Sequence, residues 1–386
     1  MLDFSDICHQ QSAIDRIQQS LRSGRLPHAM LFAGPSGVGK RTTALALGRT
    51  LLCQSPGTFQ RADLASASRG ERKGALLQAC GGCESCRLVA AQTHPDLHVI
   101  HKELVRYHPD KVVQGRKMQD LGIDVIRHFL IGPAWKCSAM KRGKVFVVLD
   151  ADLMSDEAQN ALLKTLEEPP PLVRIILITQ QAEALLATTL SRCWLVRFSP
   201  LPRSFVSDRL IGQGVPPQEA HFWAGYTDGS LGQASRLHES GLYEVKRELA
   251  DSLANLPACG RVELAEELRN LADKLSDQAV GRAKREFSVE LAESVAGRHA
   301  SAMLIQLIAS LYRDAMLTAA GSSGPICNSD QPRQVNALAG RFAPRELVKI
   351  INQLAAYETM LWRNVNQRLL WDNIAITCAS AAPLAW

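Results

Sequence analysis

Two apolar runs joined by an amphipathic helix make residues 144–193 the stretch that most constrains the fold. Residues 145–149 and 175–178 are continuously apolar, as in strands that are buried on both faces. Between them, Ser155 is placed to cap a helix whose apolar residues recur at i, i+3, i+4, i+7 and i+8. The prolines at 169–171 end that helix, because proline has no N–H to donate. Strand, helix and strand with short links predict a parallel α/β unit.

An eleven-residue motif and a tripeptide in this stretch carry a family resemblance. The motif covers residues 160–170 and reads Asn-Ala-Leu-Leu-Lys-Thr-Leu-Glu-Glu-Pro-Pro, and the tripeptide is Ser191-Arg192-Cys193. Together they resemble the bacterial clamp-loader subunits of DNA polymerase III, which belong to the AAA+ class. The resemblance extends from about residue 4 to the C-terminus and is strongest over the first 200 residues or so.

The composition indicates a folded chain of several domains. Its 386 residues correspond to two or three domains, and 46% hydrophobic with 21% charged residues permit buried cores. The 44 Lys and Arg against 38 Asp and Glu give a formal net charge of +6, which allows contact with nucleic acid. The acidic N-terminus has no hydrophobic signal core, and no apolar run of about 18 residues occurs. We therefore expect a cytoplasmic protein with no membrane partner.

A glycine-rich loop joins an expected strand at residues 26–33 to an alanine- and leucine-rich helix that ends at Leu52. Strand, glycine-rich turn and helix are the context of a phosphate-binding loop, in which backbone N–H groups and the helix N-terminus face an anion. The lysine of the loop would reach the β- and γ-phosphates. A glycine-rich turn that binds nothing is the alternative. The residues expected to contact ATP or ADP are Gly34, Gly37, Gly39, Lys40 and Thr42.

Three positions argue against hydrolysis by this chain. Arg41 stands where a Ser or Thr hydroxyl normally coordinates Mg²⁺, and an arginine cannot ligate a cation. By the resemblance, the family's Asp-Glu pair falls on Leu149 and Asp150, and an arginine that senses the γ-phosphate falls on Gly232. Asp152 is nearby and is expected to be an exposed turn residue. The isolated chain is therefore expected to show no ATPase activity, and Mg²⁺ is not expected to be held here.

Four cysteines form a metal-site pattern: Cys53, Cys80, Cys83 and Cys86. Four thiolates satisfy tetrahedral zinc, and the two-residue spacing of the last three lets one loop supply three corners. The clamp-loader subunits that this chain resembles carry such a zinc module between the first helix and the second strand. Here residues 54–79, expected to be a polar loop, separate the first cysteine from the others, which makes it the least certain ligand. Unligated thiols are the alternative, and His94 is expected to have a structural role in a turn.

The resemblance divides the chain into three domains. Residues 1–199 are expected to form an AAA+ α/β domain with a P-loop, a parallel sheet and the zinc module. Residues 200–257 would form a small helical lid domain, and residues 258–386 an all-α domain that assembles a ring.

The remaining segments are predicted from spacing and composition. Residues 101–120 carry charges of both signs and predict a surface excursion, and residues 123–127 open a helix. Apolar spacing predicts helices over residues 304–317 and 347–370, with a loop over residues 321–332. Three aromatic residues are expected to pack between helices rather than to stack on bases: Tyr357, Trp362 and Trp371.

The function expected for this chain depends on Arg192. By the resemblance it acts in trans, reaching the γ-phosphate bound by a neighbouring subunit, where an arginine finger is worth roughly 10³–10⁵ in rate. A subunit that keeps this finger and lacks hydrolytic groups of its own resembles the delta prime class. The expected function is a largely non-hydrolysing ring subunit of a DNA polymerase holoenzyme, a nucleotidyltransferase, in DNA replication.

The expected partners follow from the same resemblance. They are gamma/tau-type and delta-type subunits in a hetero-oligomeric ring, the sliding clamp, and primed DNA through the complex. Two other functions stay open, a gamma/tau-like motor subunit that hydrolyses ATP and a stand-alone AAA+ DNA repair protein. The alternative for Arg192 itself is a surface salt bridge.

Overall fold

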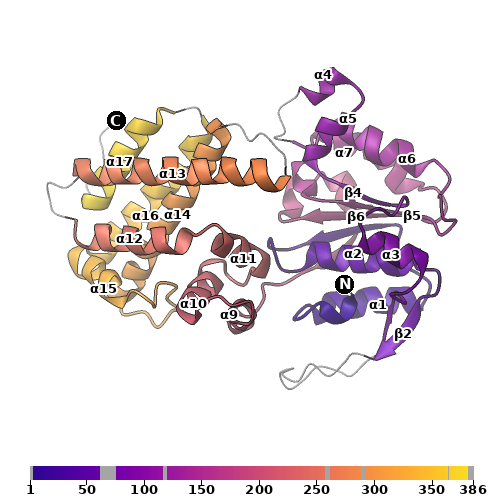
Figure 1. Ribbon diagram of the computed structural model, residues 1–386, viewed down its shortest axis with the longest axis horizontal. Helices are drawn as coiled ribbons and strands as arrows, with labels where there is room; N and C mark the ends of the chain where they lie inside the picture. Colours follow the sequence, from indigo (N-terminus) through magenta and orange to yellow (C-terminus); the bar gives the residue numbers. More distant parts are fainter. Residues whose placement is uncertain are drawn as a thin grey trace. The chain divides into compact units, whose positions relative to one another are not determined.

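The computed structural model describes residues 3–60, 75–115, 120–256, 261–287, 293–363 and 365–380 (Figure 1). The chain divides into two compact units, Met1–Pro202 and Arg203–Trp386. The three-domain division at residues 199 and 257 stays a prediction. In the part of the chain described, no helix combines the length and the apolar composition needed to cross a membrane.

A five-stranded parallel sheet forms the first unit, in the order β4-β5-β6-β1-β7. Its strands are β1 (Ala29–Ala33), β4 (Leu97–Ile100), β5 (Lys144–Val148), β6 (Val173–Thr179) and β7 (Trp194–Arg197). Ile175 pairs with Phe146 on one side and with Ala29 on the other, so β6 lies between β5 and β1. The predicted parallel sheet is confirmed, although β1 begins three residues later than expected.

Helices cover both faces of this sheet (Figure 1). One face packs against α5 (Ile123–Ile126) and α7 (Asp156–Glu167), and its core includes Phe146, Ala158 and Leu162. On the other face lies α2 (Lys40–Leu52), whose Gly48 is so close to the sheet that a Cβ would sit 3.1 Å from Leu97. The expected cap is present, because the Ser155 hydroxyl accepts a hydrogen bond from the Ala158 N–H at 3.2 Å.

The described part of the first unit contains further helical elements. They are η1 (Phe4–Asp6), α1 (Gln11–Arg22), α3 (Glu84–Ala90), η2 (Lys102–Tyr107), α4 (Lys111–Gln114), the π-helical η3 (Arg127–Ile131), α6 (Gly132–Ala134), η4 (Ala151–Leu153), η5 (Ala182–Ala184) and α8 (Ala187–Leu190).

Two loop predictions in the first unit are wrong in part. Within residues 54–79, β2 (Gly57–Gln60) and β3 (Ala75–Gln78) form an antiparallel pair, while residues 61–74 lie outside the described residues. The Gln18 side-chain amide completes β3, because it donates to the Leu77 carbonyl at 2.9 Å and accepts from its N–H at 2.8 Å. The stretch 101–120 is not wholly a surface excursion either, since it contributes buried Val105 and Val113 to the core.

The second unit is helical in its described residues. Its elements are α9 (Arg203–Gly212), α10 (Pro217–Tyr226), α11 (Leu231–Glu239), α12 (Leu242–Ala254), α13 (Arg261–Phe287), α14 (Glu293–Ala319), α15 (Pro332–Arg341), α16 (Pro344–Met360), η6 (Leu361–Arg363) and α17 (Gln367–Ala379). The helical C-terminal region is thus confirmed, with α14 packed against α13, α15 and α16.

One helix and one aromatic residue differ from expectation in this unit. The helix predicted over residues 347–370 is interrupted by η6, so that α16 and α17 are separate helices. Tyr357 and Trp371 are buried as predicted, and the Tyr357 hydroxyl lies 3.2 Å from the Thr377 hydroxyl of α17. Trp362, in η6, is 53% exposed, and its ring still packs edge-on against His299 of α14, with 5.2 Å between the ring centres.

Candidate functional site

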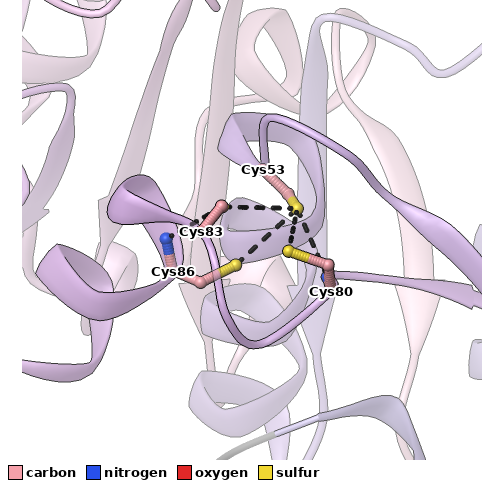
Figure 2. A group of neighbouring side chains, drawn as sticks. All are labelled: Cys53, Cys80, Cys83 and Cys86. Carbon is pink, nitrogen blue, oxygen red and sulfur yellow. Dashed lines mark hydrogen bonds between the residues drawn. The ribbon is translucent and has the colours of Figure 1, made fainter.

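The four predicted cysteines converge on one point (Figure 2). Cys53 ends α2, Cys83 caps α3, Cys86 lies in its first turn, and Cys80 precedes both. The Sγ atom of Cys53 lies 3.5, 3.8 and 3.6 Å from those of Cys80, Cys83 and Cys86, and none of the four is in a disulfide. The spacing of Cys83 and Cys86 follows from the helix cap, because an N-cap residue and the third residue after it both lie at the N-terminal end of α3.

The separations between the sulfur atoms fit a tetrahedral metal. Sulfur ligands about 2.3 Å from zinc are separated by about 3.8 Å along each edge of the tetrahedron. All four sulfur atoms lie within 4.8 Å of one another. The arrangement can therefore hold a metal ion with little movement, and the Cys53 side chain has the geometry of a full member of the group.

Backbone N–H groups favour the thiolate form of one cysteine in this cluster. Burial opposes ionisation of Cys83, but N–H groups of Gln54 and Cys86 hydrogen-bond to its sulfur and lower its pKa to about 6. Burial and the adjacent Cys83 sulfur raise the pKa of Cys86 to about 12. Four neighbouring thiolates repel one another, and a bound cation would compensate their charge.

A buried hydrogen-bond network ties the cysteine cluster to the sheet. His94 Nδ1 accepts from the Asp96 N–H at 3.1 Å, so its Nε2 carries the proton toward the Ser85 hydroxyl, 3.0 Å away. Ser85 in turn donates to the Leu52 carbonyl at the end of α2, at 2.8 Å. The structural role predicted for His94 is confirmed, because its ring joins α3 to the start of β4 and stays outside the sulfur cluster.

The loop predicted to bind phosphate lies where β1 ends and α2 begins. Gly34, Gly37 and Gly39 all have positive φ angles, and a Cβ on Gly34 would lie 2.2 Å from the Phe198 carbonyl oxygen. No other residue fits at Gly34 without moving the backbone. The side chain of Gln10, which the sequence did not single out, braces this loop by donating to the carbonyls of Val38 and Ser199.

Lys40 is turned back onto its own loop. Its buried ammonium donates to the carbonyl oxygens of Gly34 and Pro35. Burial lowers the pKa of Lys40 to about 8, against the opposing fields of Asp152 and Asp150. Thr42 is half-buried on α2. A nucleotide phosphate would have to replace both carbonyl contacts of the lysine.

The two positions expected to lack the family's acidic pair lie at the end of β5. Leu149 and Asp150 follow the strand, and Asp150 is exposed, with a left-handed backbone conformation. Asp152 is not the exposed turn acid expected, because it is half-buried and accepts from the Thr179 hydroxyl and the Gln180 N–H. Arg41 is exposed on the first turn of α2.

Arg192 lies just beyond α8, in the middle of the Ser-Arg-Cys motif. Its Nε donates to Glu167 Oε1 at 2.7 Å, and its Nη1 donates to the Thr188 carbonyl at 2.9 Å. The Arg192 side chain is 34% exposed. Glu167 was not predicted as a site residue, although it is part of the recognised motif. In the second unit, Gly232 is exposed in the first turn of α11, where Ser230 caps the helix.

Residues 9–202, just over half of the chain, match the family model described as DNA polymerase III, delta subunit. Residues 265–378 match the model described as DNA polymerase III, delta subunit, C terminal. The chain belongs to the DNA polymerase III delta-subunit family. The predicted resemblance to clamp-loader subunits is thereby confirmed.

Curated relatives place the chain with the delta prime members of this family. It is 28% identical over 366 residues to DNA polymerase III subunit delta' of Escherichia coli (strain K12), covering 94% of this chain and 92% of the relative. The same-named subunit of Pseudomonas aeruginosa is 31% identical over 232 residues, 59% of this chain and 61% of that protein. DNA polymerase III subunit tau/gamma of Haemophilus influenzae is 30% identical over 207 residues, which are 54% of this chain and 25% of that protein. The match to the Escherichia coli delta' subunit thus spans nearly all of both chains, whereas the tau/gamma match covers a quarter of that protein.

Proposed function

We propose that this chain works in DNA replication as a delta prime-type ring subunit that activates ATP hydrolysis at a neighbouring subunit without hydrolysing ATP itself. Membership of the DNA polymerase III delta-subunit family supports the clamp-loader role. Gamma/tau-type and delta-type subunits would be the immediate partners, and the sliding clamp and primed DNA would be reached through the complex. As for other subunits of a DNA polymerase, the site of action would be the cytoplasm.

The position of Arg192 is the observation that carries this proposal. Its side chain is one-third exposed just after α8, while the positions that would support hydrolysis within this chain hold Leu149 and Arg41. An arginine that reaches outward can neutralise charge in a transition state on another subunit. A leucine cannot bind a metal-bound water, and a gamma/tau-like motor function therefore lacks its chemistry here.

The cysteine cluster would hold one structural zinc ion. Its ligands would be Cys53, Cys80, Cys83 and Cys86, and the sulfur separations described above support them. A four-thiolate site is closed, so the metal would fasten α2 to α3 and take no part in chemistry. The phosphate-binding loop would bind ATP or ADP through Gly34, Gly37, Gly39, Lys40 and Thr42, with little dependence on Mg²⁺ because Arg41 supplies no ligand.

ATP turnover by the assembled loader tests the proposal. Arg192→Ala should leave folding and assembly intact but lower clamp- and DNA-stimulated turnover partially, because one nucleotide site loses a charge that stabilises its transition state. Arg197→Ala, which removes another exposed arginine of the same unit, is the matched control. Unchanged stimulated turnover in the Arg192→Ala loader would reject the trans role.

A further inference from the structure

Two motifs that are separate in the sequence meet through one ion pair. Glu167 ends α7 within the eleven-residue motif, and Arg192 belongs to the tripeptide after α8. Both Nε and Nη2 of Arg192 contact the single oxygen Oε1 of Glu167, at 2.7 and 2.5 Å. We propose that Glu167 is a positioning residue that orients the guanidinium of Arg192 for contact with a nucleotide on the neighbouring subunit. This inference rests on the proposed trans role of Arg192.

The side of the guanidinium that Glu167 contacts is consistent with a role in orienting the Arg192 side chain. Nε and Nη2 form one side of the guanidinium plane, while Nη1 and Nη2 form its outer end. Glu167 takes the side, and the outer end is the edge suited to bidentate contact with phosphate oxygens. Nη1 donates to the Thr188 carbonyl at 2.9 Å and to the Ser191 hydroxyl at 3.3 Å. The carboxylate and these two acceptors together fix the guanidinium plane, and a phosphate would take over the weaker Nη1 contacts while Glu167 keeps the side.

Helix α7 holds the segment that carries Arg192 at both of its ends. The buried Gln159 side chain of α7 accepts from the Leu186 N–H at 2.8 Å, immediately before α8. Eight residues further along the same helix, Glu167 binds Arg192 immediately after α8. Helix α7 therefore holds both the start of α8 and the arginine side chain, which limits the directions that the guanidinium can take.

The exposure of the pair indicates that stability is not its main contribution. Glu167 is 47% exposed and Arg192 34% exposed, and ion pairs of this kind add little to the stability of a fold. An arginine side chain, by contrast, loses considerable rotamer freedom when it acts, and an existing partner lowers that entropic cost. Removing the carboxylate should thus affect catalysis in trans more than folding.

Steady-state ATP turnover of the assembled loader, with clamp and primed DNA, tests the positioning role. Glu167→Ala should lower stimulated kcat by about two- to fivefold, the range expected for an exposed ion pair, with KM for ATP unchanged. Glu167→Gln, which keeps an acceptor oxygen, should fall between wild type and Glu167→Ala. Glu168→Ala removes the adjacent exposed carboxylate and should behave as wild type. In loader that already carries Arg192→Ala, Glu167→Ala should have no further effect.

The outcomes separate this inference from the proposed function. If Arg192→Ala lowers kcat but Glu167→Ala leaves it unchanged or raises it, the positioning role is rejected and the trans role stands. An equal loss from Glu167→Ala with and without Arg192 would also reject it, because Glu167 would then act independently of the finger. If Arg192→Ala has no effect, both claims fail. Thermal unfolding and ring assembly of each variant exclude a folding defect as the cause.

Discussion

The hydroxyl of Thr179 donates a 2.8 Å hydrogen bond to Asp152 Oδ1 across the carboxyl ends of β5 and β6. The same oxygen accepts from the Gln180 N–H at 3.2 Å. Asp152 is the acidic residue best placed by sequence to compensate for Leu149, but its carboxylate is engaged in joining two segments of the sheet edge. We expect its role to be structural, because both contacts join the segment after β5 to the end of β6.

Asp152→Ala should weaken the fold without changing ATP turnover. Loss of the carboxylate removes one acceptor of the buried Thr179 hydroxyl, which keeps the Gln181 carbonyl at 2.9 Å, and leaves the exposed Gln180 N–H to water, so the free energy of unfolding should fall by about 0.5–1.5 kcal/mol. Chemical denaturation should reveal this loss, while ATP hydrolysis by the isolated chain stays at background in wild type and variant. Glu183→Ala, at an exposed acid in the nearby η5, should leave stability within about 0.5 kcal/mol. Turnover that depends on Asp152 would contradict a structural role.

Zinc content is expected to depend on all four cysteines, including Cys53. Elemental analysis of protein purified without chelator should give about one zinc per chain, as one four-thiolate site requires. Cys53→Ser should release the metal and lower the thermal midpoint, because the ion fastens α2 to α3. Cys137→Ser, at an exposed cysteine outside the cluster, is the control and should retain zinc. Full zinc content in the Cys53→Ser protein would remove that residue from the ligand set.

The stability of the protein should respond to the charge on Lys40. Because burial lowers the pKa of Lys40 to about 8, the folded protein releases this proton at lower pH than the unfolded chain, whose lysine titrates near 10.5. The unfolded state therefore holds more protons between about pH 8 and 10.5, and stability contributed by this group rises with pH in that window. Denaturation should therefore show that the free energy of unfolding of wild type, minus that of Lys40→Met, rises with pH across this range. A value that falls or stays constant would reject the lowered pKa.

Local spacing predicted which residues lie together within one loop better than it predicted contacts between distant segments. The loop from Gly34 to Thr42 and the three closely spaced cysteines were predictable because each lies within one turn and helix start. The pairing of Glu167 with Arg192 was not, since it joins residues 25 positions apart and depends on how α8 packs on α7. The β2–β3 pair was missed for a similar reason, because one of its edges is completed by Gln18, 59 residues before Leu77.

The sequence patterns also did not predict a buried ion pair in the second unit. Lys246 of α12 is fully buried and contacts both carboxylate oxygens of Asp330, at 2.7 and 2.6 Å, while the Tyr243 hydroxyl donates to the same carboxylate. The lysine also lies 4.2 Å from the ring centre of Phe222. The pair connects α12 to the segment that precedes α15, so it fixes a loop whose composition alone predicted only irregular structure.

Lys246→Met should destabilise the protein strongly, by about 3–5 kcal/mol, because Asp330 would remain buried without its counter-charge. The double variant Lys246→Met with Asp330→Leu should recover much of this loss, since two apolar side chains of similar size avoid burying a charge at all. Equilibrium denaturation of the two single variants and the double variant forms a mutant cycle that isolates the coupling between them. Arg247→Met, at the exposed neighbouring position, should change stability little. A double variant as unstable as the sum of its two single variants would show that Lys246 and Asp330 act independently, and would remove the ion pair as the reason for their burial.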